Sequence, residues 1–384
     1  MPPLLPASEI ELAHMVRNAT GLIDIEGSGT KAGLGRPTQS EVTLSTRLLR
    51  GITLYEPSEM VISARAGTPL AEIEASLAEK GQMLPFEPMD YRPLLGSQGE
   101  PTLGGVVACN LAGPRRFALG SARDHLIGVR LVNGKGEIVK SGGRVMKNVT
   151  GLDLVKLSCG AFGTLGVLSE VTFKVLPRPQ STASLAFHGL DDARAIRALT
   201  LAIRSPFSIT GAAHVPTEAT YIRVEGFESS VAYRIGELRQ LLSEFGEAEL
   251  LVDDIATRLW QRIANAVPLA DVKERAIWRV SMKATLAPAF VAAVAGTLDT
   301  RHFYDWGGAL VWLSVPDEGD AGAHVLRSAL PGGHATLVRA SLATRAHSDV
   351  FQPPGSALLQ ITRSLKAAFD PLGRLNAGRM YPGI

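Results

Sequence analysis

Four glycine-rich loops in the first half of the chain constrain its fold more than any other feature of the sequence. They occupy residues 25–33, 99–114, 120–124 and 160–168. Short β-rich runs and a few helical segments separate them. Glycine permits positive φ angles and lets the backbone approach a neighbouring group closely. Four such loops in one domain exceed what chain reversal alone usually needs, so we expect some of them to serve a ligand.

The first loop, residues 25–33, follows a short predicted strand. Gly27 and Gly29 leave several backbone N–H groups free of bulky neighbours. Such a loop can cradle phosphate oxygens, with the hydroxyls of Ser28 and Thr30 as further donors. Glycine-rich turns also occur in proteins without a ligand, so this loop alone is equally compatible with a plain turn. No Gly-Lys-Ser or Gly-Lys-Thr stands at the spacing of a P-loop, which excludes an ATPase.

The second loop, residues 99–114, contains the pair Gly104-Gly105 followed by a run of small residues. This composition allows a planar ring or a pyrophosphate to lie close to the backbone, and it equally fits a tightly packed helix start. Cys109 lies within the run, where a buried thiol is more often a small core residue than a reactive one. Both interpretations of the loop stay open at this point.

The local pattern predicts antiparallel pairing in this part of the chain. Residues 60–65 form a predicted strand, after which the hydroxyl of Thr68 caps a predicted helix that begins with Pro69. Two alternating runs within residues 127–140 flank an Asn-Gly-Lys-Gly turn, which is typical of a tight hairpin. The sheet is therefore not expected to be a purely parallel, doubly wound one.

Residues 177–179, Pro-Arg-Pro, mark the predicted domain boundary. The first domain is expected to span residues 1–179 and the second residues 180–384. Beyond the boundary, helical patterns alternate with strand-like runs, the helices at 191–204, 228–245 and 286–298 and the strands at 221–224, 277–282, 309–315 and 335–339. We therefore expect an α+β cap domain to follow the first domain.

Composition excludes several classes of partner. The 39 basic and 37 acidic residues nearly balance and form no long run of one sign, which argues against nucleic acid. Two cysteines cannot supply the four ligands of an iron–sulfur cluster or a structural zinc site. None of the eight histidines forms a His-x-His or His-x-x-x-His pair, so no metal site is expected. No basic segment precedes an early apolar stretch and no segment is apolar enough to cross a bilayer, so we expect a cytoplasmic protein.

Ordered motifs along the chain resemble a known family. Three segments resemble the PCMH-type FAD-binding domain of vanillyl-alcohol-oxidase-type flavoproteins, namely Thr102–Gly105, Val145–Leu154 and Gly163–Leu168. Five further segments resemble, nearly end to end, the FAD-binding E subunit of bacterial glycolate oxidase, namely Gly27–Pro37, Leu111–Arg116, Asp305–Leu310, Gly332–Thr336 and Asn376–Tyr381. The resemblance implies an α+β fold in which a two-subdomain PCMH-type FAD-binding domain precedes an α+β cap domain with a C-terminal segment that returns to the flavin.

The resemblance also implies a set of FAD contacts. The first loop would hold the pyrophosphate, other loop residues would line the rest of the cofactor, and a C-terminal asparagine would return to the flavin. The expected cofactor-binding residues are Glu26, Gly27, Ser28, Gly29, Thr30, Thr102, Leu103, Gly104, Gly105, Gly113, Pro114, Ser121, Gly166, Val167, Leu168 and Asn376. No histidine lies between His14 and His125, so we expect FAD to be bound non-covalently.

Catalytic residues are harder to assign. His334 and Arg339 are candidates for a base and a carboxylate-binding arginine that face the flavin, with packing between cap strands as the alternative. Arg115 and Arg116 are candidates for holding an anionic substrate or a cofactor phosphate, with a solvated surface as the alternative. The histidine-rich C-terminal motif of catalytic relatives, including the larger D subunit of glycolate oxidase, is absent from this chain.

The resemblance implies the FAD-binding subunit of a glycolate oxidase complex acting on a small 2-hydroxy acid. Its expected partners are a larger FAD-binding catalytic subunit and an iron–sulfur subunit that receives the electrons. Peripheral attachment to the inner membrane through these partners is an alternative to a purely cytoplasmic location. Two other functions stay open, a free-standing FAD-dependent 2-hydroxy-acid dehydrogenase or related reductase, and a non-catalytic subunit for electron relay or assembly.

Overall fold

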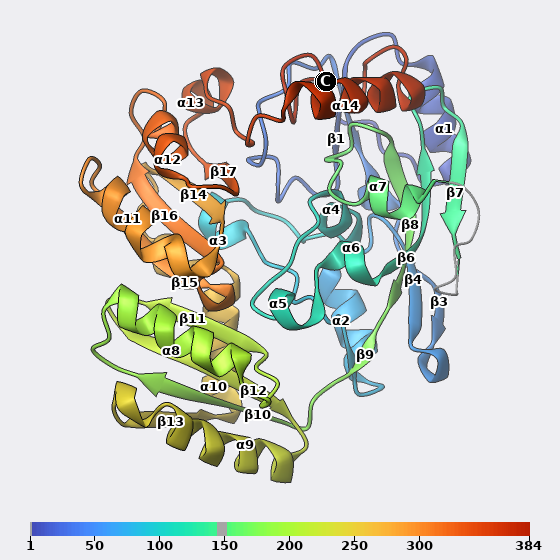
Figure 1. Cartoon of the computed structure of the whole chain (residues 1–384). Coiled ribbons are helices and arrows are strands. Elements are labelled where there is room, and N and C mark those ends of the chain that lie inside the picture. Colours follow the sequence, from blue (N-terminus) through green and yellow to red (C-terminus); the bar gives the residue numbers. More distant parts are fainter. Residues whose placement is uncertain (1, 144–151) are drawn as a thin grey trace.

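The computed structural model describes residues 2–143 and 152–384 (Figure 1). Of the segment Val145–Leu154, which carries part of the family resemblance, residues 145–151 lie outside the described residues. The chain forms two large sheets, and both are antiparallel in every strand pair that the structure describes. Helices cover these sheets without a repeating strand–helix–strand order. The predicted α+β class is therefore confirmed.

A five-stranded sheet forms the larger part of the first domain, in the order β3-β4-β8-β6-β7. Its strands are β3 (Ile52–Glu56), β4 (Val61–Arg65), β6 (Leu126–Val132), β7 (Ile138–Gly142) and β8 (Val167–Lys174). The predicted hairpin is formed by β6 and β7, with Val132 opposite Ile138. The helices of this part are α2 (Leu70–Ala78), α3 (Arg92–Leu95), α4 (Leu103–Ala108), α5 (Arg116–Leu119), α6 (Ala122–His125) and α7 (Leu154–Ser158). Their apolar side chains share one core with the sheet, which fixes the glycine loops at its edge.

The start of α2 differs from the prediction. Pro69 occupies the N-cap position, and its side chain makes no capping hydrogen bond. The buried hydroxyl of Thr68 instead donates to the carbonyl of Arg65 at 2.7 Å and accepts from the N–H of Gly51 at 2.9 Å. A buried hydroxyl must find hydrogen-bond partners, and here the preceding turn supplies them. The predicted cap at Thr68 is therefore wrong, although the helix itself is present.

A second, smaller subdomain precedes this sheet in the chain. Strand β1 (Ile23–Glu26) pairs in parallel with β2 (Val42–Ser45), and helix α1 (Glu9–Asn18) packs beside them. Leu12, Val16, Ile23 and Leu44 form a compact core together with Leu375 from the far end of the chain. A short pair, β5 (Gln82–Met83) with β9 (Leu176–Pro177), closes the first domain. Because β1 ends at Glu26, the first glycine loop begins on a rigid strand.

The second large sheet has eight strands in the order β13-β10-β12-β11-β15-β16-β14-β17. Its strands are β10 (Ser181–Phe187), β11 (Gly211–Val215), β12 (Ala219–Gly226), β13 (Ala248–Val252), β14 (Arg275–Ser281), β15 (Arg301–Asp305), β16 (Leu310–Pro316) and β17 (His334–Arg339). The helices are α8 (Asp192–Arg204), α9 (Glu228–Leu241), α10 (Asp253–Ala264), α11 (Ala287–Ala295), α12 (Ala323–Ala329), α13 (Leu342–His347) and α14 (Ser356–Phe369). All seven helical and strand patterns expected in this part correspond to elements of the structure.

The two faces of this sheet have different neighbours. Helices α8, α9, α11 and α12 cover one face and share a core with it that includes Trp278, Tyr304 and Leu313. The opposite face carries Ile277, Phe303 and Trp312, which belong to the core of the first domain. The face that carries Ile277 therefore packs against the first domain, and Figure 1 shows the two parts side by side.

A buried network of ion pairs connects the two parts. Arg115, which precedes α5, forms two hydrogen bonds to Glu225 on β12, at 2.9 and 2.5 Å. Arg223, on the same strand, forms two to Glu87, at 2.8 and 3.0 Å. The side chains of Arg223 and Glu225 are only 2% and 6% exposed. Arg115 also lies 3.3 Å from Glu87, so two carboxylates hold its guanidinium, which is not part of a solvated surface.

The C-terminal segment returns to the first domain (Figure 1). The N–H of Ile23 donates to the carbonyl of Arg374, and the N–H of Asn376 donates to the carbonyl of Ile23, each at 2.9 Å. The buried ammonium of Lys366 on α14 donates to the carbonyl of Thr164 at 2.8 Å. These bonds place residues 374–376 alongside β1. Within residues 2–143 and 152–384, no helix has the length and apolar character that a bilayer crossing requires.

Candidate functional site

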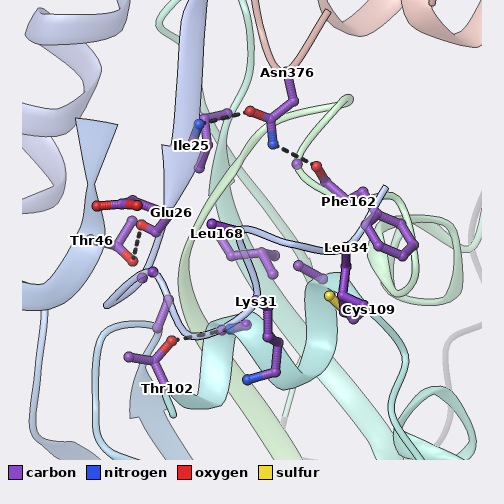
Figure 2. A pocket seen from close by; sticks show the side chains of 18 of the residues that line it. Ile25, Glu26, Lys31, Leu34, Thr46, Thr102, Cys109, Phe162, Leu168 and Asn376 are labelled. Atoms are coloured by element: carbon purple, nitrogen blue, oxygen red, sulfur yellow. Dashed lines mark hydrogen bonds between the residues drawn. The ribbon is translucent and has the colours of Figure 1, made fainter. Parts of the chain in front are cut away.

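A pocket opens where the first glycine loop, α4, the loop before β8 and the C-terminal segment meet (Figure 2). Concave sites of this kind are where cofactors and other small molecules bind. Its lining residues are Asp24, Ile25, Glu26, Gly27, Ser28, Gly29, Thr30, Lys31, Ala32, Leu34, Thr46, Ala66, Thr102, Gly104, Gly105, Ala108, Cys109, Phe162, Gly163, Gly166, Leu168, Asn376 and Arg379. Four segments that are distant in the sequence therefore form one binding site.

The first loop presents a row of unused backbone donors to this pocket. Among the described residues, none of the N–H groups of Gly27 to Lys31 donates to a protein acceptor. Gly29 adopts a φ of +78°, a backbone conformation that glycine accepts readily. The carbonyls of the loop are held from behind, because Ser45 donates to Gly27 and Thr46 donates to Glu26. Consecutive free N–H groups in such a turn form a nest for an anion, as phosphate binding requires.

The beginning of α4 forms the adjoining wall. The hydroxyl of Thr102 accepts a hydrogen bond from the N–H of Gly105 at 3.3 Å and so caps the helix. An added Cβ at Gly27 would lie 2.3 Å from this hydroxyl, so Gly27 and Thr102 are in direct contact. Figure 2 shows Lys31 extending along α4. The loop and the helix therefore fit together only while residue 27 has no side chain.

Lys31 is a half-buried cation within the pocket. Its burial lowers the pKa of its ammonium group, while Cys109 and Asp90 act in the opposite direction. The contact in the structure that approaches a hydrogen bond is the one to its neighbour Thr30, at 3.5 Å. A lysine in this position adds positive charge beside the N–H nest, which favours an anionic ligand.

Asn376 connects the C-terminal segment to two walls of the pocket (Figure 2). Its side-chain carbonyl accepts from the N–H of Ile25, and its amide nitrogen donates to the carbonyl of Phe162, both at 2.7 Å. The residue is buried and adopts a φ of +43°, which asparagine tolerates better than most residues. Asn376 thus joins β1, the fourth glycine loop and the C-terminal segment.

Replacement of Asn376 by alanine is expected to lower the free energy of unfolding by about 2–4 kcal/mol, because both hydrogen bonds are lost and two backbone groups are left without partners. Urea denaturation of the purified chain measures this loss. Alanine at the exposed Asn18 serves as the control and should change stability by less than about 0.5 kcal/mol. Equal stability of the two variants would contradict this role of Asn376.

The structure brings most of the expected cofactor-binding residues together, but not all of them. Those that line the pocket are Glu26, Gly27, Ser28, Gly29, Thr30, Thr102, Gly104, Gly105, Gly166, Leu168 and Asn376. Leu103 and Val167 point into the hydrophobic cores. Gly113 accepts a hydrogen bond from the indole of Trp306 at 3.0 Å, with Pro114 next to it, and Ser121 donates to Asp124 at 2.8 Å. These last three residues lie outside the pocket lining.

His334 and Arg339 lie on β17, away from the pocket lining. His334 is exposed. The guanidinium of Arg339 donates to the carbonyls of Arg275, Leu94 and Val272. These contacts favour the packing alternative for Arg339 over a role beside a flavin.

Sequence reasoning missed several lining residues, among them Asp24, Lys31, Phe162 and Arg379. Phe162 belongs to the fourth glycine loop and Arg379 to the C-terminal motif, so their position in these motifs was an available signal. Arg379 donates to Asp24 across the pocket wall. No local pattern indicates that pair, because the two residues are far apart in the sequence.

Comparison with known proteins identifies the class of this fold. A family model described as "FAD binding domain" matches residues 4–142. The crystal structure of p-cresol methylhydroxylase with substrate bound superposes with a TM-score of 0.72 at 13% identity, covering 98% of this chain and 87% of that one. The chain thus has the fold of the PCMH-type, vanillyl-alcohol-oxidase-type flavoproteins, with an FAD-binding domain and a cap domain.

Sequence similarity narrows this class to one family. The chain is 40% identical to "Glycolate oxidase subunit GlcE" of Escherichia coli (strain K12) over 372 residues, which cover 97% of this chain and 95% of the relative. "Glycolate oxidase subunit GlcD" of Bacillus subtilis (strain 168) is 29% identical over 160 residues, covering 41% of this chain and 33% of the relative. The chain belongs to the GlcE family of glycolate oxidase subunits.

The pocket fits the cofactor of this class. The row of free N–H groups suits a pyrophosphate, and the glycine at position 27 lets this loop pack directly against Thr102 at the start of α4. Lys31 contributes a positive charge at the same place. The first loop would therefore hold the pyrophosphate, with α4 and the fourth loop beside the rest of the cofactor.

Proposed function

We propose that this chain is the FAD-binding subunit of a glycolate oxidase complex that takes part in the oxidation of glycolate to glyoxylate. Electrons pass to a separate iron–sulfur subunit and then to an acceptor other than NAD. The observation that carries the proposal is the row of free N–H groups at Gly27 to Lys31, within a chain similar to GlcE along nearly its whole length. Bound FAD supplies the hydride acceptor, which protein side chains lack.

In this scheme the residues of the chain bind FAD and hold it in a fixed orientation. The N–H groups of the first loop hold the phosphates, and Thr102 keeps α4 in place behind them. Cys109 lines the pocket, but burial raises the pKa of its thiol to about 11. A thiol that stays protonated at neutral pH is a poor nucleophile, which supports a non-covalent flavin.

The same scheme assigns the substrate oxidation to the complex rather than to this chain alone. In support, neither His334 nor Arg339 lies at the pocket, and the metal-ligand histidine motif of catalytic relatives is absent from the sequence. The expected partners are the larger FAD-binding subunit and the iron–sulfur subunit. A free-standing dehydrogenase, or a subunit that only relays electrons, is an alternative that the following experiment separates.

The chain is purified alone and together with the two partner subunits, and FAD content and glycolate-dependent dye reduction are measured. We expect the isolated chain to carry FAD that acid precipitation releases into solution, and dye reduction to require the complex. Turnover by the isolated chain would favour the free-standing dehydrogenase. Folded, colourless protein that does not take up FAD would contradict every flavin-based function, and flavin retained in the acid pellet would contradict non-covalent binding.

Two further assignments belong to this proposal. The domains divide at residue 179, into 1–179 and 180–384, which is supported by the change from one large sheet to the other between Lys174 and Ser181. The C-terminal segment follows the second domain in the sequence, but its hydrogen bonds to Ile23 attach it to the first domain. The protein acts in the cytoplasm, with attachment at the inner membrane through its partners as the alternative.

A further inference from the structure

Two arginines from different domains approach the same indole ring. The guanidinium carbon of Arg116, on α5, lies 5.0 Å from the ring centre of Trp306, and that of Arg279, on β14, lies 4.9 Å from it. The indole N–H of Trp306 is already bound to the carbonyl of Gly113, which fixes the orientation of the ring. Contact with an aromatic face attracts a cation but leaves its charge uncompensated.

Neither guanidinium has a hydrogen-bond acceptor or a carboxylate partner among the residues that the structure describes. Three other arginines between the two domains have acceptors for their guanidinium groups. Arg115 and Arg223 hold Glu225 and Glu87, and Arg339 donates to three carbonyls. Arg116 and Arg279 differ from these residues because their guanidinium N–H groups are available to a ligand.

The surroundings make this pair electrostatically unfavourable without an anion. Burial lowers the pKa of Arg279, and burial together with the charge of Arg279 lowers the pKa of Arg116. Two carboxyl groups act on the pair through space, Asp124 on Arg116 and Asp305 on Arg279, and Asp124 is already bound to Ser121. The carboxyl group of Asp305 is buried and accepts from the N–H of Trp306 at 2.7 Å. Its burial raises its pKa to about 7, so near neutral pH it is not a full counter-charge.

The pair lies between the two domains. Side chains alternate along a strand, so Arg279 is on the same face of β14 as Ile277, which packs in the core of the first domain. Arg279 is close enough to Tyr91 for its charge to influence the tyrosine hydroxyl, and Tyr91 in turn is coupled to Cys109. Cys109 lines the pocket, near Lys31. Arg279 therefore lies on the side of the second sheet that meets the first domain, and its charge acts on a tyrosine of that domain.

We propose that Arg116 and Arg279 bind the carboxylate of a small 2-hydroxy acid, with the indole of Trp306 as the apolar surface beside it. Planar guanidinium groups match a carboxylate and can each donate two hydrogen bonds to it. The phosphates of the cofactor have their own donors in the first loop, so this second set of cations serves a different anion. The placement beside a flavin rests on the function proposed above.

The test uses the full chain loaded with FAD and oxalate as a carboxylate that is not oxidised by hydride removal. Oxalate binding is followed by the change in flavin absorbance and, independently, by calorimetry. We expect Arg279→Met and Arg116→Met each to weaken oxalate binding at least tenfold while FAD content is unchanged. Arg279→Lys keeps the charge and should retain part of the affinity. Arg301→Met, at a half-exposed arginine paired with Asp271 in the bend before β14, is the control and should bind oxalate normally.

Thermal unfolding separates a ligand site from a structural role. Because the two arginines lack partners, their replacement by methionine should leave the melting temperature unchanged or raise it. Unchanged oxalate affinity in both methionine variants would overturn the proposal, as would inorganic phosphate binding as tightly as oxalate. If calorimetry detects oxalate binding that depends on Arg279 but the flavin spectrum does not change, the site does not lie beside the flavin. If the chain binds oxalate but takes up no FAD, the anion site is supported and the flavin-based function is contradicted.

Discussion

Replacement of Gly27 by valine is expected to weaken FAD binding by at least a hundredfold while the chain still folds. An added Cβ at this position would lie 2.3 Å from the hydroxyl of Thr102, so either the loop or the start of α4 must move. Displacement of the loop disperses the N–H groups of residues 27–31, and loss of two hydrogen bonds to a charged phosphate costs about 3 kcal/mol or more. The flavin-to-protein ratio after purification and a fluorescence titration of the apoprotein measure the effect.

The control for this substitution is Gly355→Val, since Gly355 has open space around its Cβ position and an extended backbone. It should leave FAD content unchanged. Gly29→Val tests the same loop by a different route, because its φ of +78° strains a β-branched residue. If both Gly27→Val and Gly29→Val retain full FAD occupancy, the pyrophosphate is not at this loop.

Neutralising Glu225 is expected to cause the largest loss of stability, about 3–5 kcal/mol for Glu225→Gln. Glu225 contacts Arg115 at 2.5 Å and Arg223 at 3.4 Å, and all three side chains are largely buried. Removal of its charge leaves two buried guanidinium groups sharing Glu87 alone. Denaturant unfolding measures the loss. Glu249→Gln, at an exposed glutamate paired with His188, is the control and should cost less than about 1 kcal/mol.

The same network gives a defined pH dependence. Despite the opposing effect of burial, the two arginines lower the pKa of Glu225 to about 2, from its ordinary value of 4.5. A carboxyl group whose folded pKa is depressed stabilises the fold above its unfolded pKa, and this stabilisation is lost as the pH falls. We therefore expect the contribution of Glu225 to be complete above about pH 4.5 and to disappear towards pH 2. Glu225→Gln should show a smaller loss of stability across this range than the unmodified chain.

The sequence predicted elements best where a pattern was local and repeated. The hairpin of β6 and β7, strand β4 and helices α8, α9 and α11 all follow from periodicity and turn residues. Strands β10 and β11 were missed, because their sequences, STASLAF and GAAHV, are rich in small residues and do not alternate. Their place in the sheet is set by pairing with β12, a tertiary constraint that no local window contains.

In the candidate site, too, local features were predictable and contacts between the domains were not. Its loops were identified because glycines cluster along the chain and because ordered motifs resemble a family. The contacts of Arg115 with Glu225 and of Arg116 and Arg279 with Trp306 join residues from the two domains. Adjacent arginines thus have different environments, one in a salt-bridge network and one with free donors, and their sequence neighbours do not distinguish them.

The hydrogen bond between Asn376 and Ile25 joins residues that are 351 positions apart. During synthesis on the ribosome, the first glycine loop emerges long before the segment that completes its wall. The pocket can therefore close only after nearly the whole chain described here has been translated, and contacts of such high sequence separation form late in folding. Cofactor incorporation in this architecture is consequently a late event in biogenesis, and a nascent chain arrested before residue 376 has no finished site to fill.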